Sequence, residues 1–378
     1  MSFISFLRTC YLSWSHSTPL PDLPDAAPPV FQHWHIFNKS TGKWTPVQLG
    51  PLDDAQPQPQ PHRLGGTAPT ISQTPDLQLL TWNIDAFGNR PESRMEGLLS
   101  KLQQMHAGDN TGPDIVFFQE VSRKALVYLL QNAWIKDFWI SSEADDRNWA
   151  DVPFATMTLL SRSRFGVPSS NSNPGSQPAS TWLPGAAATA SSGGFHLGPV
   201  WRVKYPSRFN RDALCCDIIW NRTARIRLVN VHLDSLPIQP NQRPRQVAIA
   251  ADLLRTAGVG RGVIAGDWNP VTEEDMALAR ENNLIDAWEY LHPGESGFTW
   301  GLDGKGDPFP AARLDRVAVL GVRLVDIRVI HPETLPTATS SREEEIAGDS
   351  REEVPWSDHS GLICNFAVSG TARSDGSY

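Results

Sequence analysis

The sequence predicts a layered α/β sandwich, in which two β-sheets pack face to face and helices cover their outer surfaces. Short apolar runs typical of strands outnumber the segments with helical periodicity, and the helical segments lie between the strand-like ones. With 378 residues, of which 40% are hydrophobic, the chain can bury one large core. Several strand-like runs end in polar residues, which indicates that their ends meet at a common site.

The N-terminal region, residues 1–76, shows little hydrophobic periodicity. It includes the polar, Pro- and Gln-rich stretch 51–62, so we expect most of the region to be flexible. Within it, 31–49 contains two aromatic runs on either side of a polar turn, a pattern typical of a small hairpin.

One folded domain is predicted over residues 77–368. Two segments inside it have the composition of disordered inserts: 168–194 is made of Ser, Pro, Gly and Ala with few apolar residues, and 335–355 is acidic. The remaining residues, 369–378, are expected to form a flexible tail.

Four segments of this domain carry helical periodicity. In the first, 91–106, apolar residues at three- and four-residue spacing mark one buried face. The other three helices are predicted at 123–132, 243–256 and 272–282. The predicted strands are 77–80, 114–119, 138–142, 155–161, 200–205, 213–220, 225–232, 262–267, 313–319, 324–330 and 361–368.

Five strand-like runs place polar residues at or beside their ends. The clearest case is Asp267 with Asn269, which follow an apolar run and, being two residues apart, point to the same side of an extended chain. Alone, this segment is equally well a strand end followed by a helix cap. The other four runs carry Asn83, Glu120, His232 and the pair Asp358-His359. Five such segments together predict a common site.

The carboxylates of this set favour a hard metal ion. Glu120 with Asn83, and Asp358 with Asp267, offer oxygen ligands that suit Mg²⁺, with Mn²⁺ as a substitute. Magnesium is held by one or two carboxylates together with substrate phosphate, so a phosphate ester is the expected substrate.

The remaining polar residues fit chemistry on a phosphate ester. His232 and His359 can donate to phosphoryl oxygens, and Asp267 can orient or deprotonate the attacking water. Asn269 can hold that water or the phosphate in line.

The charge of −8 argues at first against a nucleic-acid partner, because phosphate binding usually leaves a basic surface. Residues 342–353 alone carry a net −4, however, so half of the excess lies in one acidic segment. Four cysteines without CxxC spacing are expected to be reduced thiols, which predicts an intracellular protein of the nucleus or cytoplasm. No apolar run reaches 18 residues, so no membrane span is expected.

Six motifs resemble, in order and spacing, the motif set of the endonuclease/exonuclease/phosphatase superfamily over residues 77–368. They are Thr81-Trp82-Asn83, Gln119-Glu120, Asn230-Val231-His232-Leu233, Gly266-Asp267-Trp268-Asn269, Arg313-Leu314-Asp315-Arg316 and Ser357-Asp358-His359. Each motif is short, but the ordered set is specific. The resemblance implies a four-layered α/β sandwich that requires a divalent metal and cleaves phosphodiesters or phosphomonoesters.

Further details resemble the 5′-tyrosyl-DNA phosphodiesterases of that superfamily. They are Thr81–Asp85, Phe118–Val121, Pro206-Ser207 followed by Arg211, His232–Ser235 and Arg245-Gln246. This resemblance implies an Mg²⁺-dependent phosphodiesterase that acts, as a monomer, on nucleic-acid 5′ ends, single-stranded or end-proximal, and on 5′-phosphotyrosyl-DNA adducts in DNA repair.

The resemblance also assigns roles to matching residues. Glu120 would hold Mg²⁺, with Asn83 close by, and Asp358 would orient His359 or a water on the metal. Asp267 and Asn269 would position the nucleophile and the phosphate.

Other matching residues would contact the phosphoryl group or support those that do. His232, Ser235 and His359 would contact it directly, and Arg211 would face the scissile phosphate or its leaving group. Asp315 would support these groups without touching substrate.

Trp268 departs from the tyrosyl-DNA subfamily, which usually has a small polar residue at that position. We expect it either to pack beneath the site or to contact the end group of the substrate. A strand-binding groove has basic and aromatic candidates: Arg90, Arg202, Lys204, Arg208, Arg243, Arg245, Trp201 and Phe209.

Other activities of the same superfamily stay open at this point. They are those of an abasic-site endonuclease, an RNA deadenylase, a sphingomyelinase and a phosphoinositide phosphatase. An inactive binding scaffold is the alternative from a different class, and the competent residue at every metal and catalytic position argues against it.

Overall fold

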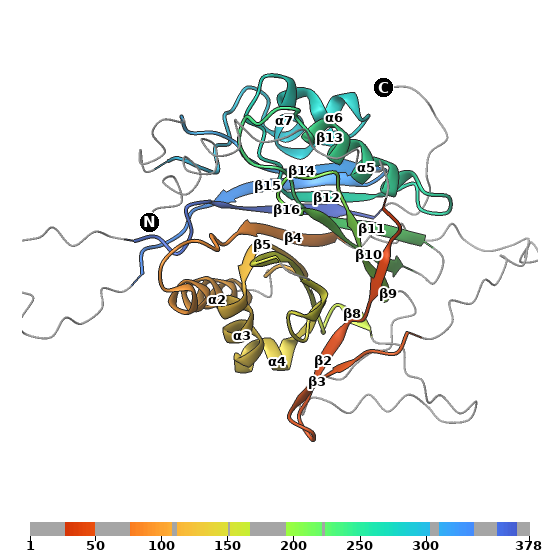
Figure 1. Ribbon diagram of the computed structural model, residues 1–378. Helices are drawn as coiled ribbons and strands as arrows, with labels where there is room; N and C mark the ends of the chain where they lie inside the picture. Colours follow the sequence, from red (N-terminus) through yellow and green to blue (C-terminus); the bar gives the residue numbers. More distant parts are fainter. Residues whose placement is uncertain are drawn as a thin grey trace, which may run out of the picture.

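Two mixed sheets, each of eight strands, pack face to face and carry helices on their outer surfaces (Figure 1). This computed structural model describes residues 27–49, 76–107, 112–149, 152–166, 194–220, 224–302, 310–335 and 354–368. The arrangement confirms the predicted four-layered α/β sandwich. Apart from their end residues, the predicted inserts 168–194 and 335–355 lie outside the described part, as does the predicted tail.

The first sheet is built from the middle of the chain. Its order is β1 (Val30–Gln32), β9 (Phe195–Lys204), β10 (Asp212–Trp220), β11 (Ala224–His232), β12 (Gly262–Asp267), β14 (Asp315–Leu320) and β13 (Ile285–Asp286), with β8 (Phe165–Gly166) beside β9. Of the strand pairs in this described sheet, β11 with β12 and β8 with β9 are parallel. The β11–β12 pair places His232 beside Asp267 at the carboxyl ends of the two strands.

The second sheet combines the two ends of the described chain. Its order is β15 (Arg323–Ile330), β16 (Gly361–Ala367), β4 (Asp76–Asn83), β5 (Ile115–Ser122), β7 (Phe154–Ser161), β6 (Trp139–Ser141), β2 (His35–Asn38) and β3 (Lys43–Pro46). Its parallel pair, β4 with β5, places Asn83 beside Gln119. Both sheets therefore have a central parallel pair that ends in polar residues.

Helices form the two outer layers. On the second sheet lie α2 (Pro91–Ala107), α3 (Arg123–Gln131) and α4 (Ala133–Phe138), and on the first lie α5 (Arg243–Arg255), α6 (Leu278–Glu281) and α7 (Ala287–Leu291) (Figure 1). Two 3₁₀ turns accompany them, η1 (Arg147–Trp149) and η2 (Glu274–Ala277). Among the described residues, no helix is long and apolar enough to cross a membrane.

The helix predicted at 272–282 is instead the 3₁₀ turn η2 followed by the single turn α6. The Asp275 carboxylate accepts hydrogen bonds from both the backbone N–H and the hydroxyl of Thr272, which closes a tight turn at the start of the segment. The short helices α4 and α7 were not predicted, because neither is long enough to show a periodic apolar face.

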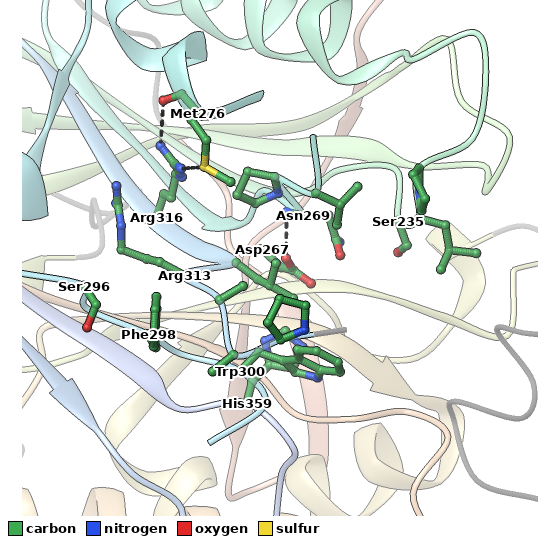
Figure 2. A pocket seen from close by; sticks show the side chains of 18 of the residues that line it. Ser235, Asp267, Asn269, Met276, Ser296, Phe298, Trp300, Arg313, Arg316 and His359 are labelled. Atoms are coloured by element: carbon green, nitrogen blue, oxygen red, sulfur yellow. Dashed lines mark hydrogen bonds between the residues drawn. The ribbon is translucent and has the colours of Figure 1, made fainter. Parts of the chain in front are cut away.

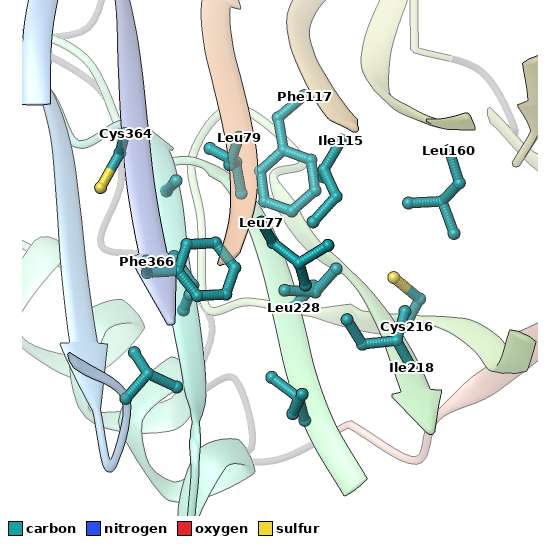
Figure 3. Packing of buried hydrophobic residues seen from close by; sticks show 14 of the residues in the cluster. Leu77, Leu79, Ile115, Phe117, Leu160, Cys216, Ile218, Leu228, Cys364 and Phe366 are labelled. Atoms are coloured by element: carbon teal, nitrogen blue, oxygen red, sulfur yellow. The ribbon is translucent and has the colours of Figure 1, made fainter. Parts of the chain in front are cut away.

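The core between the sheets is apolar, and its side chains come from both sheets (Figure 3). Leu77 and Leu79 of β4 point into this layer, whereas Leu80 and Trp82 point to the opposite face and pack under α2 and α3. Side chains on both faces of this central strand are therefore buried.

One polar bridge crosses this apolar layer close to the strand ends. The amide of Asn230 on β11 donates to the carbonyls of Phe118 and Met157, at 3.2 and 2.9 Å, and its oxygen accepts from Gln119 Nε2 at 2.8 Å. Asn230 is completely buried, so these bonds have no competition from water. They fix the position of one sheet against the other at the level of the polar strand ends.

The N-terminal segment contributes to both sheets. β1 pairs with β9 of the first sheet, while β2 and β3 form an antiparallel hairpin that joins the second sheet through β6. Between them, the indole of Trp34 is buried and donates to the carbonyl of Gly198 at 3.0 Å. The segment from β1 to β3 therefore connects the two sheets at one edge of the sandwich.

Candidate active site

The polar strand ends of the two sheets meet in one place. Asn83 Nδ2 donates to Asp267 Oδ2 at 3.0 Å, and His232 Nε2 lies 3.5 Å from the same oxygen and 3.7 Å from Glu120 Oε1. Asn83 and Glu120 come from the second sheet, and His232 and Asp267 from the first. Residues far apart in the sequence thus form one buried cluster.

Asp267 ends β12 and is held from two sides. Its second oxygen, Oδ1, accepts the backbone N–H of Asn269 at 2.9 Å, which stabilises Asn269 at a positive φ of 47°. Gly266 before it has a φ of 146° and lies so close to β11 that a Cβ would be 1.9 Å from the Val231 carbonyl oxygen. Burial raises the pKa of Asp267 to about 6, although His359 and the hydrogen bonds from Asn83 and Asn269 act against this shift.

Glu120 lies at a bulge of β5 and has a φ of 57°, which is uncommon for a residue other than glycine. One carboxylate oxygen accepts the N–H of Ala86 at 2.9 Å. Burial raises the pKa of Glu120 to about 8, and the nearby carboxylates of Asp85 and Asp358 raise it further against the opposing effect of Arg211. The positive groups near Glu120 therefore do not offset the free-energy cost of burying its negative charge.

His359 is paired with a buried carboxylate. Its Nδ1 lies 2.8 Å from Asp315 Oδ2, and Asp315 in turn donates its backbone N–H to the hydroxyl of Thr299 at 3.1 Å. Burial alone would lower the pKa of His359, but Asp315 and Asp358 outweigh it and raise the pKa well above its usual value. His359 is therefore cationic and fixed in orientation.

His232, unlike His359, is uncharged. Burial, together with the charges of Arg211 and His359, lowers the pKa of His232 well below its usual value, so the ring is neutral. Its Nε2 is buried and has no hydrogen-bond partner within the described ranges. An unsatisfied buried group of this kind is a candidate for contact with a ligand.

Arg211 and Ser235 lie on the loops beside His232. The guanidinium of Arg211 stacks against the rings of Phe154 and Phe209, at 5.0 and 5.3 Å from their centroids, and lies 3.4 Å from the Ser235 hydroxyl. Arg211 is nearly buried, and its positive charge acts on both Glu120 and Asp267. It therefore supplies positive charge next to the carboxylate cluster.

A pocket of about 470 Å³ opens from this cluster (Figure 2). The predicted residues Glu120, Ser235, Asp267, Asn269 and His359 all line it. Its opposite wall contains Arg313 and Arg316, which belong to the motif around Asp315, and four residues that were not predicted from the sequence: Leu236, Met276, Phe298 and Trp300.

Trp300 is the most informative of these missed residues. Its indole N–H donates to Asp358 Oδ2 at 3.2 Å, so one side chain both borders the pocket and holds a predicted site carboxylate. It lies in the irregular stretch between α7 and β14. No apolar run precedes it, which is why the strand-end pattern could not find it.

Trp268 does not contact the pocket. Its side chain is 1% exposed and packs in the apolar layer between the first sheet and α5, together with Val247, Ala251 and Leu278. Of the two expectations for Trp268, this position favours packing beneath the site over contact with the substrate, since alternation along the chain turns its side chain away from the face shared by Asp267 and Asn269.

Two of the basic residues predicted for the groove are also buried rather than available to a nucleic-acid strand. Arg202 forms ion pairs with Glu143 and Asp212, at 2.7 and 2.9 Å, and Arg243 forms one with Asp275 at 2.9 Å. Their exposed fractions are 4% and 1%. Both arginines form buried ion pairs within the protein, so a positive charge in the sequence was not sufficient to identify a nucleic-acid contact.

The cluster fits a divalent cation. Burial and the charge of Asp358 raise the pKa of both Glu120 and Asp85, and a cation beside these carboxylates would favour their ionised forms. Among the residues that the structure describes, no three His, Cys, Asp or Glu side chains are arranged to hold a metal by themselves. A hard divalent cation needs only one or two carboxylates from the protein, because water and phosphate complete its shell.

Several solved structures of known proteins are similar in fold to this chain. Among solved structures, a humanized TDP2 of D. rerio carrying 14 mutations has 20% identity and a TM-score of 0.54, and the match covers 78% of this chain and 99% of that one. TDP2 of D. rerio complexed with single strand DNA product has 19% identity, a TM-score of 0.52 and the same coverage. TDP2 of C. elegans has 18% identity and a TM-score of 0.52, covering 78% of this chain and 75% of that one. At these identities the likeness shows a shared fold.

A search of curated proteins gave no significant match. A model described as the Endonuclease/Exonuclease/phosphatase family, in contrast, matches residues 80–359, a range that includes all the polar strand ends of the cluster. The chain therefore belongs to the endonuclease/exonuclease/phosphatase family, whose members are generally metal-dependent hydrolases of phosphate esters.

Proposed function

We propose that the chain is an Mg²⁺-dependent phosphodiesterase that acts on DNA 5′ ends and removes 5′-phosphotyrosyl adducts. One observation carries the proposal: Glu120, Asp267, Asn269 and His359 all face the same pocket of about 470 Å³. The similarity of fold to TDP2 of D. rerio, whose structure contains a single-stranded DNA product, supports this substrate class.

Asp267 acts on the attacking water in this proposal. With a pKa of about 6, its carboxylate is largely ionised at neutral pH and still basic enough to accept a proton. Asn83 and the backbone of Asn269 hold this carboxylate in one orientation, so it is directed at one position in the pocket. The side chain of Asn269 lines the same wall and positions the phosphate.

The two histidines stabilise the charge that develops on the phosphoryl oxygens. His359 is cationic because of Asp315, and its Nε2 donates into the pocket. His232 is neutral and offers its unpartnered Nε2 as a further donor. Arg211 and Ser235 add a positive charge and a hydroxyl on the same side.

Mg²⁺ would be held by Glu120 with Asn83 and Asp358, where it would neutralise negative charge on the phosphate. The leaving group explains why no dedicated general acid is needed. A tyrosine phenol has a pKa near ~10, far below that of a sugar hydroxyl, and departs readily as a phenolate.

Incubation with Mg²⁺ and a single-stranded oligonucleotide bearing a 5′-phosphotyrosine tests the proposal. The expected products are free tyrosine and a 5′-phosphorylated oligonucleotide. Cleavage only of an abasic duplex, poly(A), sphingomyelin or a phosphoinositide would disprove the substrate assignment. Asp267→Asn, which preserves shape, serves as the inactive control.

Partner and location follow as parts of the same proposal. We propose that the protein acts as a monomer on single-stranded or end-proximal DNA in the nucleus or cytoplasm. The cysteines within the described ranges, Cys215, Cys216 and Cys364, are buried and unpaired, which is compatible with a reducing compartment. Light scattering during gel filtration would reveal a dimer if the monomer assignment is wrong.

A further inference from the structure

We propose that Arg243 is a positioning residue: it connects the loop that carries Ser235 to the loop that carries Asn269 and so sets the width of the active-site pocket. The inference rests on the proposed function for its catalytic consequence. The contacts of Arg243 from which we argue are all within the protein, so they do not depend on which ester is cleaved.

Arg243 lies in the first turn of α5 with its guanidinium turned inward and 1% exposed. Nη1 donates to the carbonyl of Asp234 at 2.8 Å and to that of Leu236 at 2.9 Å. These two carbonyls flank Ser235, which lines the pocket. One side chain thus holds both neighbours of a predicted phosphate contact.

The other edge of the same guanidinium reaches the second loop. Arg243 Nε lies 2.9 Å from Asp275 Oδ2, and this carboxylate oxygen accepts the backbone N–H groups of Val271 and Thr272 at 3.1 and 2.8 Å. Val271 lines the pocket two residues after Asn269. The ion pair therefore joins the loop that follows β11 to the loop that follows β12.

The Asp275 carboxylate in this connection is ionised. Burial by itself raises the pKa of Asp275, but hydrogen bonds from Arg243, Asn241 and Thr272 outweigh burial and keep the pKa below its usual value. Asp275 is completely buried, so water does not compete for the pair. Lysine would be a poor replacement, because its ammonium lacks the planar fork that reaches three acceptors at once.

The Ser235 loop needs such support because its backbone is strained. Leu236 has a φ of 67°, a left-handed conformation that is unfavourable for a residue with a side chain. Its carbonyl is one of the two that Arg243 holds. Without this contact the loop can relax, and Ser235 would move relative to Asn269.

Arg243→Met and a matched control, Arg227→Met, test the inference. Arg227 also forms a buried ion pair, with Asp217 at 2.8 Å, but at the far end of β11 from His232. Both variants are expected to lower the melting temperature. Only Arg243→Met should increase hydrogen–deuterium exchange at 233–237 and 269–272 above the wild-type level under native conditions.

Turnover of bis(4-nitrophenyl) phosphate with Mg²⁺ gives the catalytic measurement without relying on a DNA substrate. We expect kcat to fall ~10- to 100-fold in Arg243→Met with a smaller change in KM, because misplacement by about 1 Å affects the transition state most. Arg243→Lys should recover part of kcat, and Arg227→Met should retain wild-type kcat.

Three results would overturn the inference. These are unchanged exchange in both loops of folded Arg243→Met, unchanged kcat despite increased exchange, and an equal fall in kcat in Arg227→Met. If the wild-type protein hydrolyses the chromogenic diester but not 5′-phosphotyrosyl DNA, the proposed substrate is refuted. The hydrogen–deuterium exchange and kcat of Arg243→Met would still decide the role of Arg243.

Discussion

His359 Nδ1 lies 2.8 Å from Asp315 Oδ2, and Asp315 is completely buried where β14 begins. This carboxylate makes the largest contribution to the raised pKa that keeps His359 cationic in spite of burial, and Asp358 adds to it. Asp315→Asn preserves shape but removes the charge, so we expect kcat to fall ~10²- to 10³-fold with little change in KM.

The pH dependence of the Asp315→Asn variant distinguishes loss of charge from loss of fold. Since His359 must be protonated to act, its lower pKa in the variant should move the alkaline decline of kcat to lower pH. An unchanged alkaline limb in a variant with a normal melting curve would show that Asp315 does not act through His359.

Asp267 should control the acid limb of the rate profile. Its carboxylate is the active form and its pKa is about 6, so the rate should fall as the pH decreases through that value, approaching tenfold per pH unit. Asn83 donates to Asp267 and favours the ionised form. Asn83→Ala should therefore move the acid limb to higher pH, and an unmoved limb would contradict the assignment of Asp267 as the base.

Glu120 should make the stability of the metal-free protein decrease as pH rises. The folded state keeps a proton on Glu120 up to about pH 8, whereas the unfolded chain releases it near the usual value of 4.5, so the folded state binds more protons in this window. The free energy of unfolding contributed by Glu120 is thus lost as pH rises between these two values. Glu120→Gln should flatten this dependence in urea titrations.

Magnesium should reverse this loss. Binding to ionised Glu120 releases a proton, so Mg²⁺ should raise the melting temperature more at about pH 8.5 than at about pH 6. Chelation should abolish both the thermal shift and turnover. An equal Mg²⁺ shift in Glu120→Gln would show that the metal binds elsewhere.

Trp268 should affect stability without affecting substrate binding. Because its side chain is 1% exposed and packs against α5, Trp268→Ala should lower the free energy of unfolding by ~3–5 kcal/mol, and Trp268→Phe by less. KM should stay within about twofold of wild type, since the cavity left by the smaller side chain would lie outside the pocket. A large increase in KM would restore the idea that Trp268 contacts the end group.

The sequence was sufficient to locate the cluster, since apolar runs ending in Asn83, Glu120, His232 and Asp267 predict strand ends that meet at a common site. The alternation of side chains that places Asp267 and Asn269 on one face also turns Trp268 toward the helix layer. Hydrogen bonds and ion pairs between residues far apart in the sequence could not be predicted. No local pattern shows that Asn230 hydrogen-bonds across the sandwich.

The basic residues show a second limit of the sequence. Arg202 and Arg243 lie near the site in the chain and resemble nucleic-acid contacts, yet both are buried against carboxylates. The partners, Glu143 and Asp275, are 59 and 32 positions away, which composition and spacing cannot reveal. Trp300 was not predicted either, because it belongs to an irregular segment that is positioned by tertiary contacts alone.

The pocket is bordered by Glu120 and His359 from the second sheet and by Asp267 and Asn269 from the first. A molecule bound there contacts both halves of the sandwich at once, so its binding free energy opposes their separation. An inhibitor of this site should therefore protect the whole domain from unfolding, including segments far from the pocket. Thermal protection would then serve as a screen for inhibitors before any physiological substrate is known.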